Sequence, residues 1–134
     1  LWAATHPVDA TTVPLLVGTA VWIVGFLFEG IADWQLTMFK RAHPPAGSIL
    51  TTGLWRYSRH PNYFGESVQW WGIWIIALAA GSGYWTIISP ALLTFLLLFV
   101  SGVPMLEKKY AYNPAFQDYK RRTSVFVPWF PRKV

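Results

Sequence analysis

Several polar side chains in the middle of the chain have the types and spacing that bind an anion. They are Arg56, Arg59, His60, Asn62 and Glu66. Pro61 favours the first turn of an α-helix, so the free N–H groups of that turn would point toward the arginines and the histidine. Asn62 and Glu66 are four residues apart and would share one face of the helix. A phosphate would bind at the helix start, and the amide and carboxylate would hold ribose hydroxyls or a carboxamide.

The same stretch also suits a membrane boundary that binds no ligand. Arginine and histidine anchor at lipid headgroups, and Asn62 can satisfy N–H groups at the helix end. Tyr57 and Tyr63 can join an aromatic belt. Taken one at a time, the residues favour this structural interpretation, so the spacing of the whole stretch has to decide.

Two carboxylates, Glu29 and Glu66, lie inside apolar stretches near this site. An unpaired carboxylate in hydrocarbon costs several kcal/mol. We therefore expect both to face a polar cavity. The alternative is that they only pair with Arg56, Arg59 or Lys40 and hold the helices together.

Composition places these residues in a membrane protein. The chain has 134 residues, of which 54% are hydrophobic and 13% charged, with nine tryptophans. This excludes a disordered chain and a coiled coil, and nearly excludes a soluble enzyme. The net charge of +5 sits between apolar runs, so no nucleic-acid partner is expected. The absence of cysteine excludes a thiolate metal site, and no metal site is predicted.

Apolar runs predict about three membrane-spanning helices. Residues 67–106 are forty consecutive positions without Asp, Glu, Lys, Arg or His, whereas one span needs about 20. A glycine-rich turn at 80–84 divides this run into spans at about 64–80 and 85–106, and another span covers about 13–31. The predicted fold class is therefore all-α, a polytopic transmembrane helical bundle in a lipid bilayer. It forms one membrane domain over residues 1–134.

Charges predict the orientation of these spans. All eleven Lys and Arg lie between the first two predicted spans or after the third. The segment 34–63 and the C-terminus are therefore expected in the cytoplasm. We expect 34–61 to be an ordered loop because Pro44 and Pro45 break helices, and 110–122 to contain a short interfacial helix with Phe116 and Tyr119 on one side.

The stretch Ser58–Glu66, preceded by Gly53-Leu54-Trp55, resembles the signature of the steroid 5-alpha-reductase family, in its bacterial membrane-protein branch. The resemblance continues at 106–110, 116–120, Thr123 and 126–129. It covers nearly all of this chain but only the C-terminal half of a typical family domain.

The resemblance implies a membrane-embedded reductase that binds NADPH on its cytoplasmic side. Its substrate would be lipophilic and steroid-like, and a carbon-carbon double bond conjugated to a ketone would be reduced. The family's proposed catalytic Glu and Tyr belong to the N-terminal half, so no catalytic residue is assigned. The cofactor-binding residues implied are Asp33, Lys40, Arg41, Tyr57, Arg59, His60, Asn62, Tyr63, Glu66, Tyr110 and Tyr119.

Two other functions remain open at this point. Membrane methyltransferases that use S-adenosylmethionine share a similar Arg-His-Pro core, although the Asn62–Glu66 segment resembles the reductases more. A half-length relative without catalysis could instead serve as a structural subunit of a larger membrane complex, with a separate chain beside it.

Overall fold

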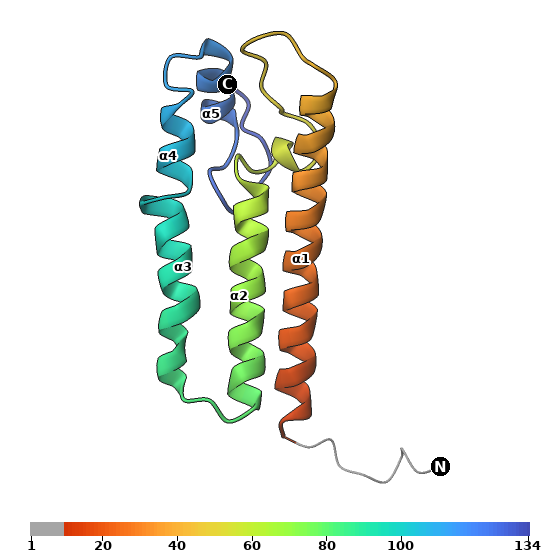
Figure 1. Ribbon diagram of the computed structural model, residues 1–134, viewed down its shortest axis with the longest axis vertical. Helices are drawn as coiled ribbons and strands as arrows, with labels where there is room; N and C mark the ends of the chain where they lie inside the picture. The colour runs from red at the N-terminus through yellow and green to blue at the C-terminus, as the bar shows by residue number, and fades with distance from the viewer. Residues whose placement is uncertain (1–9) are drawn as a thin grey trace, which may run out of the picture.

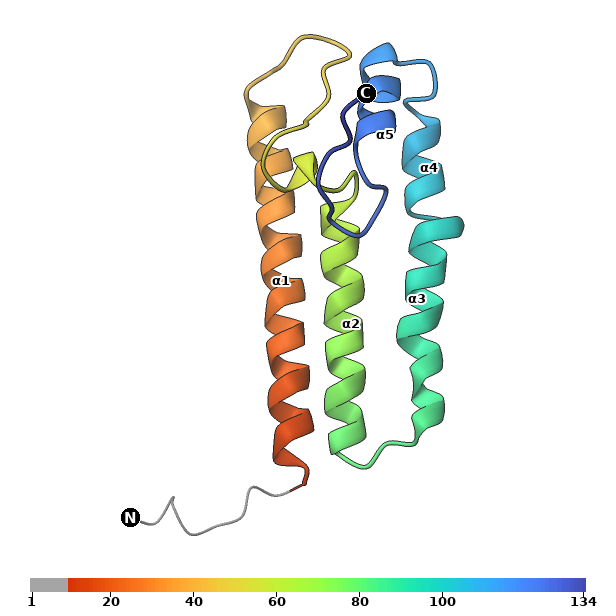
Figure 2. The same ribbon diagram turned by 180° about the vertical axis from the view of Figure 1, so that it is seen from behind.

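The computed structural model describes residues 10–134, and the regular elements within them are all helical. α2 lies between α1 and α3, and α4 continues from α3 toward the end of the bundle that holds α5 and the C-terminus (Figures 1 and 2). The prediction of an all-α membrane protein is confirmed. The elements are α1 (Thr12–Arg41), a 3-10 turn (Gly53–Arg56), α2 (Pro61–Ala79), a second 3-10 turn (Tyr84–Ile87), α3 (Ile88–Phe99), α4 (Val103–Lys108) and α5 (Pro114–Arg122).

Two helical segments are long and apolar enough to cross a bilayer. They are Thr12–Arg41 and Tyr84–Lys108. α2 has 19 residues and runs between them, but its first turns carry polar side chains. The crossing by α2, and therefore the three-span arrangement, stays a prediction.

The first helix is longer than the sequence predicted, so the expectation of a loop from residue 34 is wrong. α1 continues to Arg41, and Ala42 is its C-cap. Residues 32–41 contain polar side chains but no glycine or proline, and polarity alone does not end a helix. The chain leaves the helix at His43, whose φ is 47°, just before Pro44.

The span predicted over 85–106 coincides with an apolar helical segment, but that segment is not one unbroken helix. α3 ends at Phe99 and α4 begins at Val103, with a break between them. Pro104 has no N–H, and its ring would collide with the carbonyl of Val100 in a continuous helix. Gly102 allows the tight turn, because a Cβ there would lie 2.5 Å from the Leu97 carbonyl oxygen. The break separates α3 from α4, which carries Glu107.

Small residues at seven-residue intervals bring α1 and α2 together. A Cβ on Gly25 would lie 2.6 Å from the Gly65 carbonyl oxygen, and one on Gly72 would lie 2.6 Å from the backbone nitrogen of Trp22. Gly25 and Ala32, seven residues apart, are both buried on α1. The two backbones are therefore in direct contact, the arrangement that small residues permit between membrane helices.

Three further predictions about local structure are confirmed. Residues 80–83 form the turn between α2 and the following helix, with Gly81 at φ 91°. Pro61 opens α2. The helix in the tail begins at Pro114, and Phe116 and Tyr119 are both buried on one side of it.

Candidate functional site

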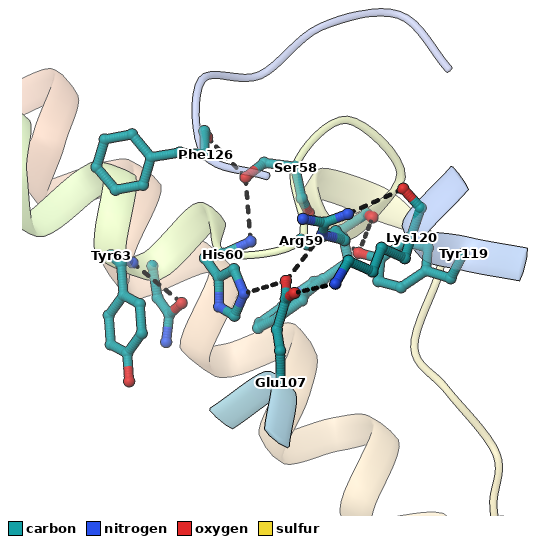
Figure 3. Close-up of polar contacts among 10 residues, drawn as sticks. Ser58, Arg59, His60, Tyr63, Glu107, Tyr119, Lys120 and Phe126 are labelled. Carbon is teal, nitrogen blue, oxygen red and sulfur yellow. Dashed lines mark hydrogen bonds and ion pairs between the residues drawn. The ribbon is translucent and has the colours of Figure 1, made fainter. Parts of the chain in front are cut away.

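The carboxylate of Glu107 is the centre of a charged cluster at the start of α2. Its oxygens lie 2.9 Å from Arg59 Nε, 3.0 Å from His60 Nε2 and 3.5 Å from Lys120 Nζ (Figure 3). The Glu107 side chain is only 11% exposed, so these contacts replace most of its water. A buried carboxylate requires such partners, because the loss of hydration must be offset.

The segment before α2 is fixed in this position by the C-terminal tail. The Ser58 hydroxyl is buried, donates to the Phe126 carbonyl at 2.7 Å and accepts from the His60 backbone N–H at 3.1 Å. The Arg59 backbone N–H donates to the Ser124 carbonyl at 2.8 Å. Arg59 and His60 are therefore buried between two distant parts of the chain.

Tyr119 closes the cluster from α5. Its hydroxyl lies 3.1 Å from the Ser58 carbonyl oxygen and also within hydrogen-bond distance of the Trp55 carbonyl. Burial raises the pKa of Tyr119, because the phenolate would lose its hydration. Tyr119 is thus held as a neutral donor to backbone carbonyls.

A cavity of about 320 Å³ opens beside this cluster, between the end of α1, the α1–α2 connection, α4 and α5. Its volume is within the usual range for small-molecule sites. The apolar part of its wall includes Phe39, Trp55 and Phe116. The polar part of its wall is formed by Lys40, Ser48, Arg59, His60, Glu107, Tyr110 and Tyr119.

Some of the residues implied by the family resemblance meet at this cavity. They come from α1, from the segment before α2, from the turn after α4, and from α5. Their cations and phenols surround a largely apolar space. These residues are Lys40, Arg59, His60, Tyr110 and Tyr119.

A second group lies along the contact between α1 and α2. The Asn62 amide donates to the Asp33 carboxylate at 3.0 Å, and the Tyr63 ring stacks on the His60 ring at 5.5 Å between centroids. The Asn62 side chain also accepts from the Tyr63 backbone N–H, so it satisfies one free N–H in the first turn of α2, as the structural interpretation expected. The amide thus serves the helix end and a neighbouring carboxylate together.

Glu66 lies on the same face of α2, one turn after Asn62. Two turns along, the Gln69 amide donates to the Glu29 carboxylate of α1. Within residues 10–134, neither Glu66 nor Glu29 forms an ion pair with a cation. The alternative, in which these two carboxylates pair with Arg56, Arg59 or Lys40, is therefore not found in the described part of the chain. Neither carboxylate lines the cavity or the hollow that Arg56 lines, so the expectation that they face a polar cavity stays a prediction.

Three of the expected residues lie apart from both groups. Arg41 is exposed at the end of α1. Tyr57 packs edge-on against Phe130 at 6.3 Å between ring centroids. Arg56 lines a different hollow from the one that Arg59 and His60 line. The anion nearest to Arg59 and His60 is the protein's own Glu107 carboxylate.

Sequence reasoning missed the central role of Glu107 and Lys120. Glu107 is the first charged residue after forty uncharged positions, and this place marks it as a carboxylate at the membrane boundary. Its partner Arg59 lies 48 positions earlier, so no local spacing links the two. Within residues 10–134, no group of three His, Asp or Glu side chains is placed to hold a metal ion.

The fold and the site together define a helical membrane protein with a polar cluster and a cavity at one end of its bundle. A family profile described as "Protein of unknown function (DUF1295)" matches residues 2–123. The chain belongs to this family, which is steroid 5-alpha-reductase-like.

Curated relatives carry the name 3-oxo-5-alpha-steroid 4-dehydrogenase 1. The protein from Bos taurus is 31% identical over 115 residues, covering 85% of this chain and 41% of the relative. The Homo sapiens protein is 28% identical over 127 residues, covering 94% of this chain and 46% of the relative. The chain thus spans less than half the length of these relatives. No solved structure matches it.

Proposed function

We propose that the chain is part of a membrane-embedded, NADPH-dependent reductase. It would reduce a carbon-carbon double bond conjugated to a ketone in a lipophilic, steroid-like substrate. The relatives are named for a 4-dehydrogenase reaction on 3-oxo-5-alpha-steroids, and its reverse is this reduction. The proposal places the cofactor at the cytoplasmic end of the bundle.

One observation carries this proposal. Asn62 and Glu66 share a helix face beside Asp33, and no cation in residues 10–134 pairs with Glu66. A carboxylate that holds the bundle together would need such a partner. Glu66 is thus available to accept hydrogen bonds from ribose hydroxyls or a carboxamide.

The described residues fit a phosphorylated dinucleotide in part. Lys40 lines the cavity and forms no ion pair within residues 10–134, so it can receive a phosphate. The aromatic rings of Trp55 and Phe116 provide flat apolar walls. NADPH, when bound, supplies the hydride for the β carbon of the enone. The chain's residues orient the cofactor and exclude water, and the group that stabilises the enolate is unassigned.

Cofactor titration tests the proposal on protein purified from its native membrane. We expect tighter binding of NADPH than of NADH, weakened by salt, because the extra phosphate gains charge-assisted bonds to Lys40 and its neighbours. Glu66→Gln keeps the shape but removes the charge, and should weaken NADPH binding about 10- to 150-fold. Asn62→Ala should weaken it as well.

Asp118→Asn is the control, because Asp118 is a carboxylate on α5 outside the cavity wall and the α1–α2 face. It should leave NADPH affinity unchanged. Binding of S-adenosylmethionine without any dinucleotide would favour a methyltransferase. No binding of either cofactor, together with unfolding by Glu66→Gln, would favour a structural subunit.

A further inference from the structure

A second hollow, of about 480 Å³, lies between the α1–α2 connection and α5. It shares Tyr119 with the first cavity. The charged residues in its wall are Arg56, Arg122 and Asp118, and the threonines Thr51 and Thr52 also line it. Arg56 belongs to the motif before α2, but the proposed cofactor site does not use it.

Positive charge is in excess in this hollow. Within residues 10–134, Arg56 forms no ion pair, and its guanidinium lies 6.0 Å from the centre of the Tyr57 ring. Arg122 Nε lies 2.9 Å from Asp118. The same carboxylate also binds Arg121, which does not line the hollow, and Arg56 has no carboxylate partner among the described residues. The hollow is therefore suited to an anion.

The C-terminal tail places this hollow at the predicted membrane boundary. Phe126 packs edge-on against Phe64, where the second predicted span begins, at 5.7 Å between ring centroids. The tail descends beside the start of α2 before returning to α5 (Figure 2). It then exposes Trp129 and Phe130, at 70% and 75%, and Pro131 lines the hollow. Exposed aromatic rings beside cations are typical of the membrane–water interface.

We propose that this hollow binds the phosphate of an anionic membrane lipid. The planar guanidinium groups of Arg56 and Arg122 can each bind two phosphate oxygens, and the threonine hydroxyls can donate further hydrogen bonds. Trp129 and Phe130 would lie beside the glycerol and upper acyl chains. A soluble phosphate shares the headgroup chemistry but would leave these two rings without a partner. The inference does not depend on the reductase activity.

Native mass spectrometry of the detergent-purified protein tests this proposal, with phosphatidylglycerol as the probe. Arg56→Gln and Arg122→Gln should each weaken phosphatidylglycerol binding about five-fold, the effect of one cation near an anionic lipid. Arg41→Gln is the matched control, because Arg41 is also exposed but does not line the hollow. It should leave the affinity unchanged, and phosphatidylcholine should bind weakly to all forms.

Competition separates lipid from soluble phosphate. Inorganic phosphate or NADPH at the concentration of the lipid should not displace phosphatidylglycerol, and displacement by either would overturn the proposal. An equal loss in Arg41→Gln, or no loss in the two hollow variants, would overturn it too. Thr52→Val keeps all charges and should still weaken lipid binding about threefold, since it removes one hydrogen bond at an exposed site. It provides a second test if an arginine variant does not fold.

Discussion

At the scale of single residues, Glu107 joins segments that are far apart in the sequence. It binds Arg59 and His60 before α2 and Lys120 on α5. Arg59 in turn donates to the Lys120 carbonyl through Nη1 at 2.9 Å. The cluster therefore couples the motif to the tail, and the loss of one charge would leave buried partners uncompensated.

We expect Glu107→Gln to lower the free energy of unfolding by about 3 to 5 kcal/mol, because it leaves the buried Arg59 guanidinium without a counterion. Chemical unfolding in detergent measures this loss. Asp118→Asn removes a carboxylate from exposed pairs with Arg121 and Arg122, and should cost about 0.5 kcal/mol or less. If both variants lost the same free energy of unfolding, the Glu107 carboxylate would be exposed to water rather than buried against Arg59.

Tyr119 predicts a pH dependence on the alkaline side. Burial raises its pKa, so the folded protein favours the neutral phenol. The resulting stability is complete below pH of about 10, the ordinary pKa of tyrosine, and is lost as pH rises toward the higher folded value. Tyr119→Phe should lower the free energy of unfolding by about 1 to 3 kcal/mol at neutral pH.

The difference in unfolding free energy between wild type and Tyr119→Phe should therefore shrink above pH of about 10. Equilibrium unfolding at a series of alkaline pH values checks this, and the comparison cancels the effect of the other tyrosines. A difference that stays constant or grows with pH would contradict the assignment of Tyr119 as a buried neutral donor.

The chemistry of the site was partly predictable from the sequence. The spacing of Asn62 and Glu66 predicted their shared helix face, and the family resemblance led to Lys40, Arg59 and His60, which do line one cavity. The predicted grouping of Arg56 with Arg59 and His60 is wrong, because Arg56 lines a separate hollow whose position depends on where the tail and α5 pack. Glu107 was missed as their counterion for the same reason. Local spacing contains no information about contacts made through tertiary folding.

At the scale of elements, helix existence was predictable and helix ends were not. Apolar runs located α1 and the helices after residue 84, since a membrane favours helices in which every backbone group is paired. The predicted end of α1 was wrong because the helix was assumed to end where the apolar run ends. The break before α4 was missed although Pro104 signals it, because a run of uncharged residues was interpreted as one helix.

The contact between α1 and α2 depends on glycine. A Cβ on Gly65 would lie 2.5 Å from the Glu29 backbone nitrogen, so Gly65→Ala must push the helices apart. We expect it to lower the free energy of unfolding by about 3 kcal/mol. Gly30→Ala is the control on α1, because a Cβ at Gly30 meets nothing within 4 Å. It should stabilise the helix by about 0.5 to 1 kcal/mol.

Thermal unfolding in detergent compares the two glycine variants. Their opposite signs make the test independent of the general effect of alanine on helix propensity. If Gly65→Ala were as stable as wild type, the helices would not be in backbone contact. Glu66 and Asn62 would then not be held beside α1, and the proposed cofactor face would lose its support.

At the scale of the whole molecule, the helices separate charge along the long axis. The α1–α2 connection, α4, α5 and the tail lie at one end, and the turn after α2 lies at the other (Figure 1). All eleven Lys and Arg belong to the first end or the helix turns that lead into it. The candidate cavity and the second hollow are both at this end. A cofactor from the cytoplasm and an anionic lipid leaflet would therefore reach the protein from the same side.

This arrangement predicts the membrane topology. With 19 residues, α2 is about 28 Å long, close to the thickness of a bilayer core of about 30 Å. Its two ends should therefore lie on opposite sides of the membrane, with the cationic end in the cytoplasm. A cysteine reporter for the cationic end must be exposed to react with a thiol reagent. Ser58 is fully buried, so the reporter is placed at the exposed Ala46.

Ala46→Cys and Ser82→Cys test the topology. The chain has no cysteine of its own, so the unsubstituted chain should show no maleimide labelling. Ser82 is exposed in the turn after α2. In sealed right-side-out vesicles, an impermeant maleimide should label the cysteine at position 82 at once and the one at position 46 only after the membrane is opened. Inverted vesicles should give the reverse result. Labelling of both positions from one side would show that α2 does not cross the bilayer, and the cofactor face on α2 would then lie at the membrane surface rather than within it.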